Sequence, residues 1–463
     1  MSDPGLPAPR SRRRFLRSAF SVGAVLGASL LAACTPAPPA AQKTEAKPTD
    51  APKPVASPAA SPAASPGVAA SPSPAASPAA SPSPSPAAQA APAPAKPVAS
   101  GPLKLGLLVP TSAVYSQLGD DIADGMSLYL ESVGNRAGGR PIEVIREDEG
   151  IDPQPALQKA RKLIEQDRVD VFAGVVSTAV VYAIRDLLHN SQTIFVGANA
   201  GGNDLTRARK SPYIFRASFT SWQVSYPLGE WIAKNVSKKV FVSAADYGFG
   251  QESAAAFKEN FTRNGGEVVG EVYPRLGTTD YAPFLPQIQG TNPEASYSFY
   301  SGSDAVSFVK QYAEFGLKDR IKLTGAGFLV EEDVLPAQGE AAVGAISSLF
   351  WAKTLDNPEN RRFGDDYRAK TRREPSVFAV QGYDTARVIV EGVNAVGGDT
   401  ANKEALIKAL ENVKFASPRG PFEFDPQTHQ VVQTMYIRET RMQDGKPTNV
   451  VIADLGTVRD PGA

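Results

Sequence analysis

From residue 103 onward the chain alternates short apolar runs with stretches in which apolar residues recur at helical spacing. Residues 103–109 form one such run, which ends at Pro110, and Ile122, Met126 and Tyr129 then follow four and three residues apart. Apolar residues at this spacing predict a helix that packs one face against a core. Strands alternating with helices of this length predict parallel sheets with right-handed crossovers. We therefore expect an α/β fold with two parallel-sheet lobes.

The pattern also gives approximate element boundaries. Strands are predicted at 103–109, 142–145, 169–174, 194–197, 239–244, 267–273, 295–300, 321–325 and 343–350. Helices are predicted at 179–188, 222–236, 280–289, 303–316, 358–373, 377–396 and 401–411. The tail from Pro421 is predicted to form strands at 422–424, 431–438 and 450–453.

The composition excludes several classes of protein. Lys and Arg number 48 against 48 Asp and Glu, which argues against a nucleic-acid-binding protein, because such proteins carry a basic excess. The single cysteine excludes a disulfide framework, and the two histidines, His189 and His429, lie too far apart to suggest a metal centre. We predict no cofactor and no metal. Nothing indicates an oligomer, so a monomer is expected.

Residues 1–34 have the pattern of an export signal. Arginines 10, 12, 13, 14 and 17 precede an uncharged stretch, 19–33, that is shorter than the ~20 residues of a membrane helix. The segment SRRRFLR (11–17) resembles a twin-arginine signal, and LAAC (31–34) resembles a bacterial lipobox. This resemblance implies that Cys34 is lipidated and becomes the new N-terminus, which anchors an exported lipoprotein on the extracellular or periplasmic side of a membrane.

Residues 35–100 are predicted to be an unfolded tether. They hold 18 of the 40 prolines, mostly in Ala-Ser-Pro repeats, and almost no large apolar side chain. Such a segment cannot bury enough surface to offset its ordering entropy, and proline keeps it extended at ~3.1 Å per residue. It would hold the folded part away from the membrane surface.

Short motifs along the folded part resemble the branched-chain amino acid–binding family of ABC-importer solute receptors, the leucine/isoleucine/valine type of periplasmic binding protein. They are LGLLVP (105–110), GGRPIE (138–143), KLI (162–164) before VDV (169–171), GVVS (174–177), DLT (204–206) before FR (215–216), DYG (246–248) before GGE (265–267), KQ (310–311) before GL (316–317), GYD (382–384) and GPF (420–422). Each motif is weak alone, but together they occur in the family's order.

The resemblance implies two lobes joined by three hinge crossings, near 217–220, 347–351 and 416–420. Lobe 1 would comprise 101–217 plus 351–417, and lobe 2 would comprise 218–350 plus 418–463. The ligand would lie in the cleft between the lobes. The lobes would close over it and deliver it to an ABC permease in the membrane.

Ligands of open α/β sheets lie beyond the carboxyl ends of the strands. That rule nominates the loops 111–118, 177–178, 198–201, 221–223, 246–249, 300–303 and 327–330. The candidate ligand-binding residues in these loops are Tyr115, Leu118, Ser177, Thr178, Asn199, Ala200, Gly201, Ser221, Trp222, Tyr247, Tyr300 and Phe328. Ser177 and Thr178 precede a predicted helix, so they either hold a ligand carboxylate or cap that helix.

Two departures from the family pattern bear on specificity. Family members that bind aliphatic amino acids place an acidic residue after the strand at 321–325 to hold the ammonium group, whereas this chain has Gly327, with Glu331 and Glu332 a turn later. Gly201 stands where the family often offers a hydroxyl group. Because a buried ammonium needs a carboxylate partner, specificity is expected to shift toward aromatic or other small carboxylates, with amino acids kept as the alternative.

A hydrolase would need a nucleophile beside a base, and neither histidine has an evident partner, so we expect no enzyme activity. A nucleotide enzyme would need a phosphate loop, and no G-K-[ST] sequence occurs. The remaining alternative is a ligand-sensing receptor subunit for a signalling partner. An importer's solute-binding lipoprotein agrees better with an anchored and tethered chain.

Overall fold

The computed structural model describes residues 101–462, which lie in one compact unit, 89–463. The predicted signal peptide, Cys34 and the predicted tether lie outside the described residues.

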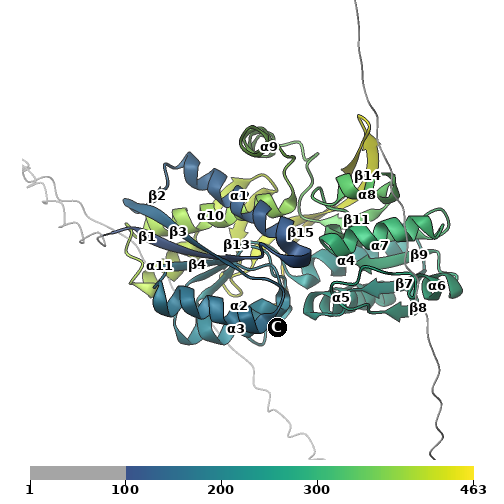
Figure 1. Cartoon of the computed structure of the whole chain (residues 1–463), viewed down its shortest axis with the longest axis horizontal. Coiled ribbons are helices and arrows are strands. Elements are labelled where there is room, and N and C mark those ends of the chain that lie inside the picture. The colour runs from purple at the N-terminus through teal and green to yellow at the C-terminus, as the bar shows by residue number, and fades with distance from the viewer. Residues whose placement is uncertain (1–100, 463) are drawn as a thin grey trace, which may run out of the picture. The chain divides into compact units, whose positions relative to one another are not determined.

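The first sheet has the strand order β2-β3-β1-β4-β5-β6 (Figure 1). Its strands are β1 (Leu103–Val109), β2 (Arg136–Ala137), β3 (Arg140–Asp148), β4 (Val171–Gly174), β5 (Phe195–Gly197) and β6 (Ile214–Arg216). All neighbours pair in parallel except β2 and β3. The parallel sheet predicted from the alternating pattern is confirmed.

Helices cover both faces of the first sheet. Alternate residues of β1 point to opposite faces: Leu107 packs in the core beneath α1 (Ser116–Ser132) and α10 (Val377–Ala395), whereas Leu108 packs beneath α2 (Pro153–Arg161) and α3 (Thr178–Asn190). Helix α9 (Pro358–Thr371) contacts α1, and α11 (Lys403–Glu411) contacts α10.

The second sheet has the strand order β12-β13-β14-β11-β10-β9-β7-β8, with β15 paired to β14. Its strands are β7 (Lys239–Ala244), β8 (Glu267–Val272), β9 (Ala295–Phe299), β10 (Lys322–Ala326), β11 (Ile346–Leu349), β12 (Lys414–Ser417), β13 (Gly420–Phe424), β14 (Val431–Gln443) and β15 (Lys446–Val458). Strands β7 to β11 pair in parallel and β12 to β15 pair antiparallel, so the strand-rich tail completes this sheet.

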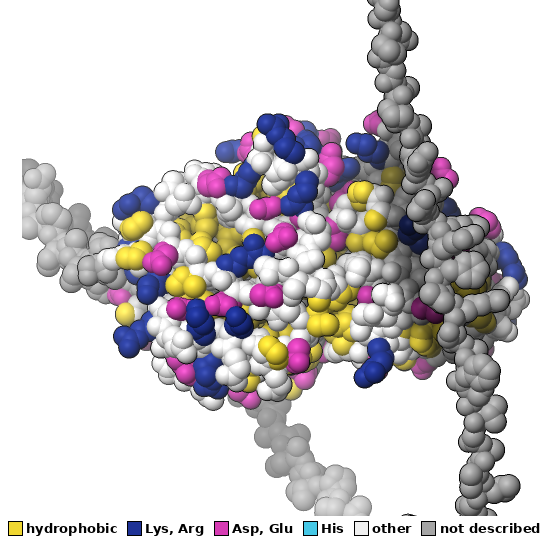
Figure 2. Space-filling view, viewed as in Figure 1, with side chains coloured by type: hydrophobic (Ala, Val, Ile, Leu, Met, Phe, Trp, Pro, Cys, Tyr) yellow, Lys and Arg dark blue, Asp and Glu magenta, His cyan; other side chains and the backbone are white. Residues whose placement is uncertain are grey.

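The second sheet is also covered on both faces. One core holds residues of α4 (Ser221–Asn235) and α5 (Gly248–Arg263), and the other holds residues of α6 (Leu285–Gly290), α7 (Ser303–Glu314) and α8 (Leu335–Gln338). On the face drawn in Figure 2, Lys and Arg side chains are interspersed with Asp and Glu side chains, in keeping with the balanced charge.

Local signals explain where several helices begin. Thr220 and Gln223 form a capping box at the start of α4, because each side chain accepts a hydrogen bond from the other residue's backbone N–H. Asp152 caps α2 and is followed by proline at the first helical position. The helix predicted at 280–289 is shorter than expected: it begins only at Leu285, with Pro286 in its first turn, where a proline is tolerated.

The C-terminal strands also contact the first sheet. The ring of Phe215 on β6 lies 4.0 Å from that of His429 and 5.3 Å from that of Phe424, measured between centroids. The backbone N–H of Arg216 donates to the carbonyl oxygen of His429. His429 therefore packs at this junction, and its Nε2 lies 3.0 Å from Oε1 of Glu411.

Candidate ligand-binding site

A small cavity lies at the carboxyl ends of strands from both sheets. Its volume is about 20 Å³, roughly the space of one water molecule, so the lining residues pack closely around it. The lining residues are Tyr115, Leu118, Val176, Asn199, Phe219, Tyr247, Phe249, Phe299, Ser301, Phe328 and Phe378. Of these, Tyr115, Leu118, Asn199, Tyr247 and Phe328 were singled out from the sequence.

Five phenylalanine rings make up most of the apolar wall. Ring centroids lie 4.8 Å apart for Phe219 and Phe328, 4.4 Å for Phe249 and Phe299, and 5.8 Å for Phe328 and Phe378, the last pair nearly stacked. Phe328 lies in the short helix Gly327–Val330 after β10, and Phe378 lies in the first turn of α10, so this pair joins the two lobes. Flat apolar walls of this kind favour an aromatic ligand.

Three buried hydroxyl groups lie in or next to the cavity wall: Tyr115 lines the cavity, and Ser177 and Thr178 directly follow the lining residue Val176. The hydroxyls of Tyr115, Ser177 and Thr178 find no hydrogen-bond partner among the described residues. Ser177 occupies the N-cap position of α3, yet its side chain makes no capping bond. Buried polar groups are nearly always paired, so three unpaired hydroxyls beside a helix N-terminus indicate a place for a polar ligand group.

Glu149 lies behind these hydroxyls and was not predicted from the sequence. Its carboxylate accepts hydrogen bonds from the backbone N–H groups of Val176 and Ser177, both at 2.7 Å, and its side chain is almost fully buried. Burial raises the pKa of Glu149 to about 8, although the two N–H groups act in the opposite direction. Its position just beyond the carboxyl end of β3 is the signal that the sequence analysis overlooked.

Two tyrosines from opposite lobes meet beside Glu149. Burial, followed by the neighbouring Tyr247, raises the pKa of Tyr115 well above its ordinary value. Burial likewise raises the pKa of Tyr247. Both phenols are therefore neutral at physiological pH.

The loop after β5 forms another part of the wall. Asn199 lines the cavity, and its side-chain amide donates to Gln381 at 2.7 Å. Ala200 is buried, with its backbone N–H bonded to Val175, and packs with the core beneath α2 and α3. A Cβ atom at Gly201 would lie 2.6 Å from the ring of Phe249 and 2.7 Å from that of Phe219. Aromatic rings thus fill the space where the family often has a hydroxyl side chain.

Seven of the twelve candidate residues are not among those that line the cavity: Ser177, Thr178, Ala200, Gly201, Ser221, Trp222 and Tyr300. The last three contact other parts of the chain. Ser221 donates to the carbonyl oxygen of Gly201 at 2.9 Å, which joins α4 to that loop. Trp222 stacks on Tyr226 at the surface of α4. The Tyr300 hydroxyl pairs with Ser243 at 2.6 Å within the second core, because alternation along the extended chain turns Phe299 and Ser301 toward the cavity and Tyr300 away from it.

The acidic residues near Gly327 do not offer a free carboxylate to the cavity. Glu331 forms a fully buried ion pair with Arg438 at 2.8 Å, and its other oxygen accepts from the N–H of Val377. Glu332 accepts from Asn449 and lies 3.7 Å from the ammonium of Lys353. No acidic side chain is among the described residues that line the cavity.

A contact between the lobes lies outside the cavity. Glu252 on α5 accepts hydrogen bonds from the hydroxyl of Tyr182 on α3 and from the backbone N–H of Asn203 at 2.8 Å. Asn203 begins the short helix Asn203–Leu205, and its side chain accepts from the N–H of Trp222. One carboxylate therefore bridges the two lobes.

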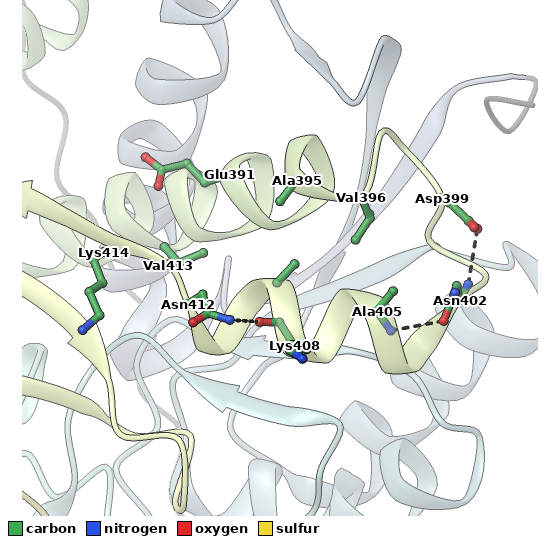
Figure 3. A pocket seen from close by; sticks show the side chains of 11 residues that line it. Glu391, Ala395, Val396, Asp399, Asn402, Ala405, Lys408, Asn412, Val413 and Lys414 are labelled. Atoms are coloured by element: carbon green, nitrogen blue, oxygen red, sulfur yellow. Dashed lines mark hydrogen bonds between the residues drawn. The ribbon is translucent and has the colours of Figure 1, made fainter. Parts of the chain in front are cut away.

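A larger hollow lies between α10 and α11, away from the strand ends (Figure 3). Its polar side chains are used within the chain: Asn402 caps α11 by accepting from Ala405, and Asn412 donates to the carbonyl of Lys408. Within residues 101–462, no helix is long and apolar enough to cross a membrane, and no group of three or more His, Cys, Asp or Glu residues is placed to hold a metal ion.

Two sheets with a cavity at the carboxyl ends of strands from both are typical of the class of two-lobed binding proteins. A family model described as periplasmic binding protein matches residues 102–446, so the chain belongs to that family. The Leu/Ile/Val-binding protein homolog 6 of Brucella melitensis biotype 1 is 32% identical over 366 residues, which cover 78% of this chain and 93% of that protein.

Solved structures give a closer view of the similarity. A solute-binding protein of an ABC transporter from R. palustris, in complex with benzoate, is 36% identical with a TM-score of 0.75. A solute-binding protein from Rhodopseudomonas palustris BisB5, in complex with 3,4-dihydroxybenzoic acid, has the same identity and TM-score. Both alignments cover 78% of this chain and 99% of the other. The predicted family and fold are confirmed: the chain is an ABC-importer-type solute-binding protein, of a family that works with a membrane permease.

Proposed function

We propose that this solute-binding protein captures a small aromatic carboxylate, of the size of benzoate or a hydroxybenzoate, and delivers it to a permease without chemical change. The observation that carries the proposal is the juxtaposition of three unpaired buried hydroxyls, of Tyr115, Ser177 and Thr178, with a wall of phenylalanine rings. The hydroxyls and the first N–H groups of α3 would hold the carboxylate, and the rings would enclose the aromatic body.

The wall of the cavity argues against an amino acid. An ammonium group buried there would need a carboxylate partner, and Glu331 is already paired with Arg438. The two R. palustris proteins with aromatic acids bound, each 36% identical, support the same class of ligand.

A thermal-shift comparison tests the proposal. Benzoate and 4-hydroxybenzoate should each stabilise the protein, by about 2.7 kcal/mol at a hundredfold excess over Kd, while benzamide, which lacks the carboxylate, should not. Leucine, isoleucine and valine should leave the melting temperature unchanged. Stabilisation by leucine without any by benzoate would show that an ammonium group is bound and would overturn the proposal.

We also propose that the chain is a lipoprotein, exported by a twin-arginine signal in residues 1–34 and anchored through Cys34, with 35–100 as its tether. The lobe boundaries near 217–220, 347–351 and 416–420 are part of the same proposal. Cys34→Ser should move the protein from the membrane fraction to the medium or periplasm. Continued membrane association of that variant would contradict the anchor.

A further inference from the structure

The proposed ligand is an anion, yet the cavity supplies no positive charge to meet it. Lys, Arg and His are not among the described residues that line the cavity. Beside the three unpaired hydroxyls lies instead a second buried carboxyl group, that of Glu149, whose side chain is only 1% exposed. A carboxylate ligand that enters this site therefore meets another acid rather than a cation.

The two carboxyl groups must lie close together. Glu149 accepts from the N–H of Ser177 at 2.7 Å, and three covalent bonds of about 1.5 Å separate that nitrogen from the Ser177 hydroxyl oxygen. The Glu149 oxygen is therefore at most about 7 Å from a hydroxyl that would bind the ligand. A ligand oxygen bonded to that hydroxyl at ~2.7 Å would lie at most about 10 Å from the Glu149 oxygen, and two ionised carboxylates in that range in a buried site repel each other.

The groups around Glu149 add no compensating charge. They are Asp148 at the end of the same strand, Tyr115 of the short helix Ala113–Tyr115 and Tyr247 at the start of α5. Asp304 of α7 acts on both tyrosines. Each of these titratable groups is an acid, so a proton is the cation most easily supplied to the site.

We propose that Glu149 takes up one proton from solvent when the ligand binds, so that the solute is held as its anion beside a neutral Glu149 carboxyl group. This inference rests on the proposed carboxylate ligand and adds a residue that sets the pH range of binding. The raised pKa of Glu149 agrees with a carboxyl group that holds a proton readily. Opening of the lobes would hydrate the group and favour the loss of that proton.

The inference can be tested by calorimetric titration of the protein with benzoate between pH 6 and 9.5. Each pH is measured in two buffers with different ionisation enthalpies, which gives the number of protons taken up per benzoate. Proton uptake should approach one per benzoate near pH 8 to 9, and Kd should rise by up to tenfold per pH unit in that range. Benzoate binding with a pH-independent Kd and no proton uptake would overturn the inference and leave the proposed function intact. Failure of aromatic acids to bind at any pH would overturn both.

Two variants assign the proton. Glu149→Gln should bind benzoate without proton uptake and with a nearly flat pH profile. Asp304→Asn is the matched control, because Asp304 is another buried carboxyl group of the same region. Burial raises its pKa only to about 6, so it is ionised between pH 8 and 9, where proton uptake is expected. That control should retain uptake. Uptake retained in Glu149→Gln would overturn the role of Glu149. If that variant does not fold, absence of uptake by the wild-type protein would still overturn the inference.

Discussion

The bridge between the lobes at Glu252 predicts that a residue outside the cavity controls ligand affinity. Its carboxylate bonds Tyr182 and Asn203 of the first lobe, and both bonds must break when the lobes separate. Hydrogen bonds to a charged group contribute ~1.5–3 kcal/mol each, but Glu252 is only half-buried, so solvent screening reduces that value. We expect Glu252→Ala to destabilise the closed form by about 2 kcal/mol, which corresponds to a roughly 30-fold higher Kd for benzoate.

The effect should appear mainly in the dissociation rate, because the bonds form after the ligand has entered. Stopped-flow release of benzoate measures that rate, and small-angle scattering without ligand gives an independent measure of lobe opening. Glu259→Ala is the matched control, since Glu259 lies exposed on the same helix and pairs only with Arg263.

A double-mutant cycle makes the test sharper. If the bond to Tyr182 is responsible, Tyr182→Phe should weaken binding in the wild type and have less effect when combined with Glu252→Ala, which removes the acceptor. A Kd for Glu252→Ala within threefold of the wild-type value, with unchanged scattering, would refute the reasoning.

Three further outcomes are expected. Thr178→Val, which keeps the shape and removes a hydroxyl, should raise the Kd for benzoate about tenfold, whereas Ser191→Ala at the far end of α3 should not. Burial raises the pKa of Glu149 to about 8 and that of Glu332 to about 7, so both groups hold protons more tightly in the folded state than in the unfolded state. Their contribution to the free energy of unfolding should be complete below about pH 4.5 and be lost as the pH rises to 8. A urea midpoint that does not fall between pH 5.5 and 9 would contradict this. Gly327→Asp should lower the melting temperature without giving leucine binding, because its Cβ atom would lie 2.6 Å from the guanidinium of Arg438.

Much of the fold could be predicted from the sequence, because the elements carry strong periodic signals. The strands predicted at 103–109 and 239–244 coincide with β1 and β7. Both are continuous apolar runs bounded by polar residues or proline, which mark the ends of the strands. Element ends were less certain where a proline interrupts a helical pattern, as at 280–289.

The site was harder to predict because it depends on which way each side chain points. The strand-end rule selected loops that contain Phe249 and Ser301, but it could not distinguish Tyr300 from its neighbours on either side. Phe378 begins a long apolar helix and Phe219 lies between two elements, so both resemble ordinary core residues in the sequence. Burial of Glu149 depends on a loop 27 residues away, which no local pattern reveals.

Gly201 and Gly327 show which features of this site could be predicted from the sequence and which could not. The sequence shows that side chains are missing at Gly201 and Gly327, but the groups that fill the space come from elsewhere in the chain. Phe219 and Phe249 close the first gap, and Arg438, which donates to the carbonyl oxygen of Gly327 from 111 positions away, closes the second. Arg438 also forms an ion pair with Glu331. The side chain that fills the space beside Gly327 is therefore the same one that pairs with the nearby carboxylate. The proposed shift in specificity therefore rests on packing and pairing as well as on the missing side chains, and we expect that restoring a single acidic residue would not recreate an ammonium site.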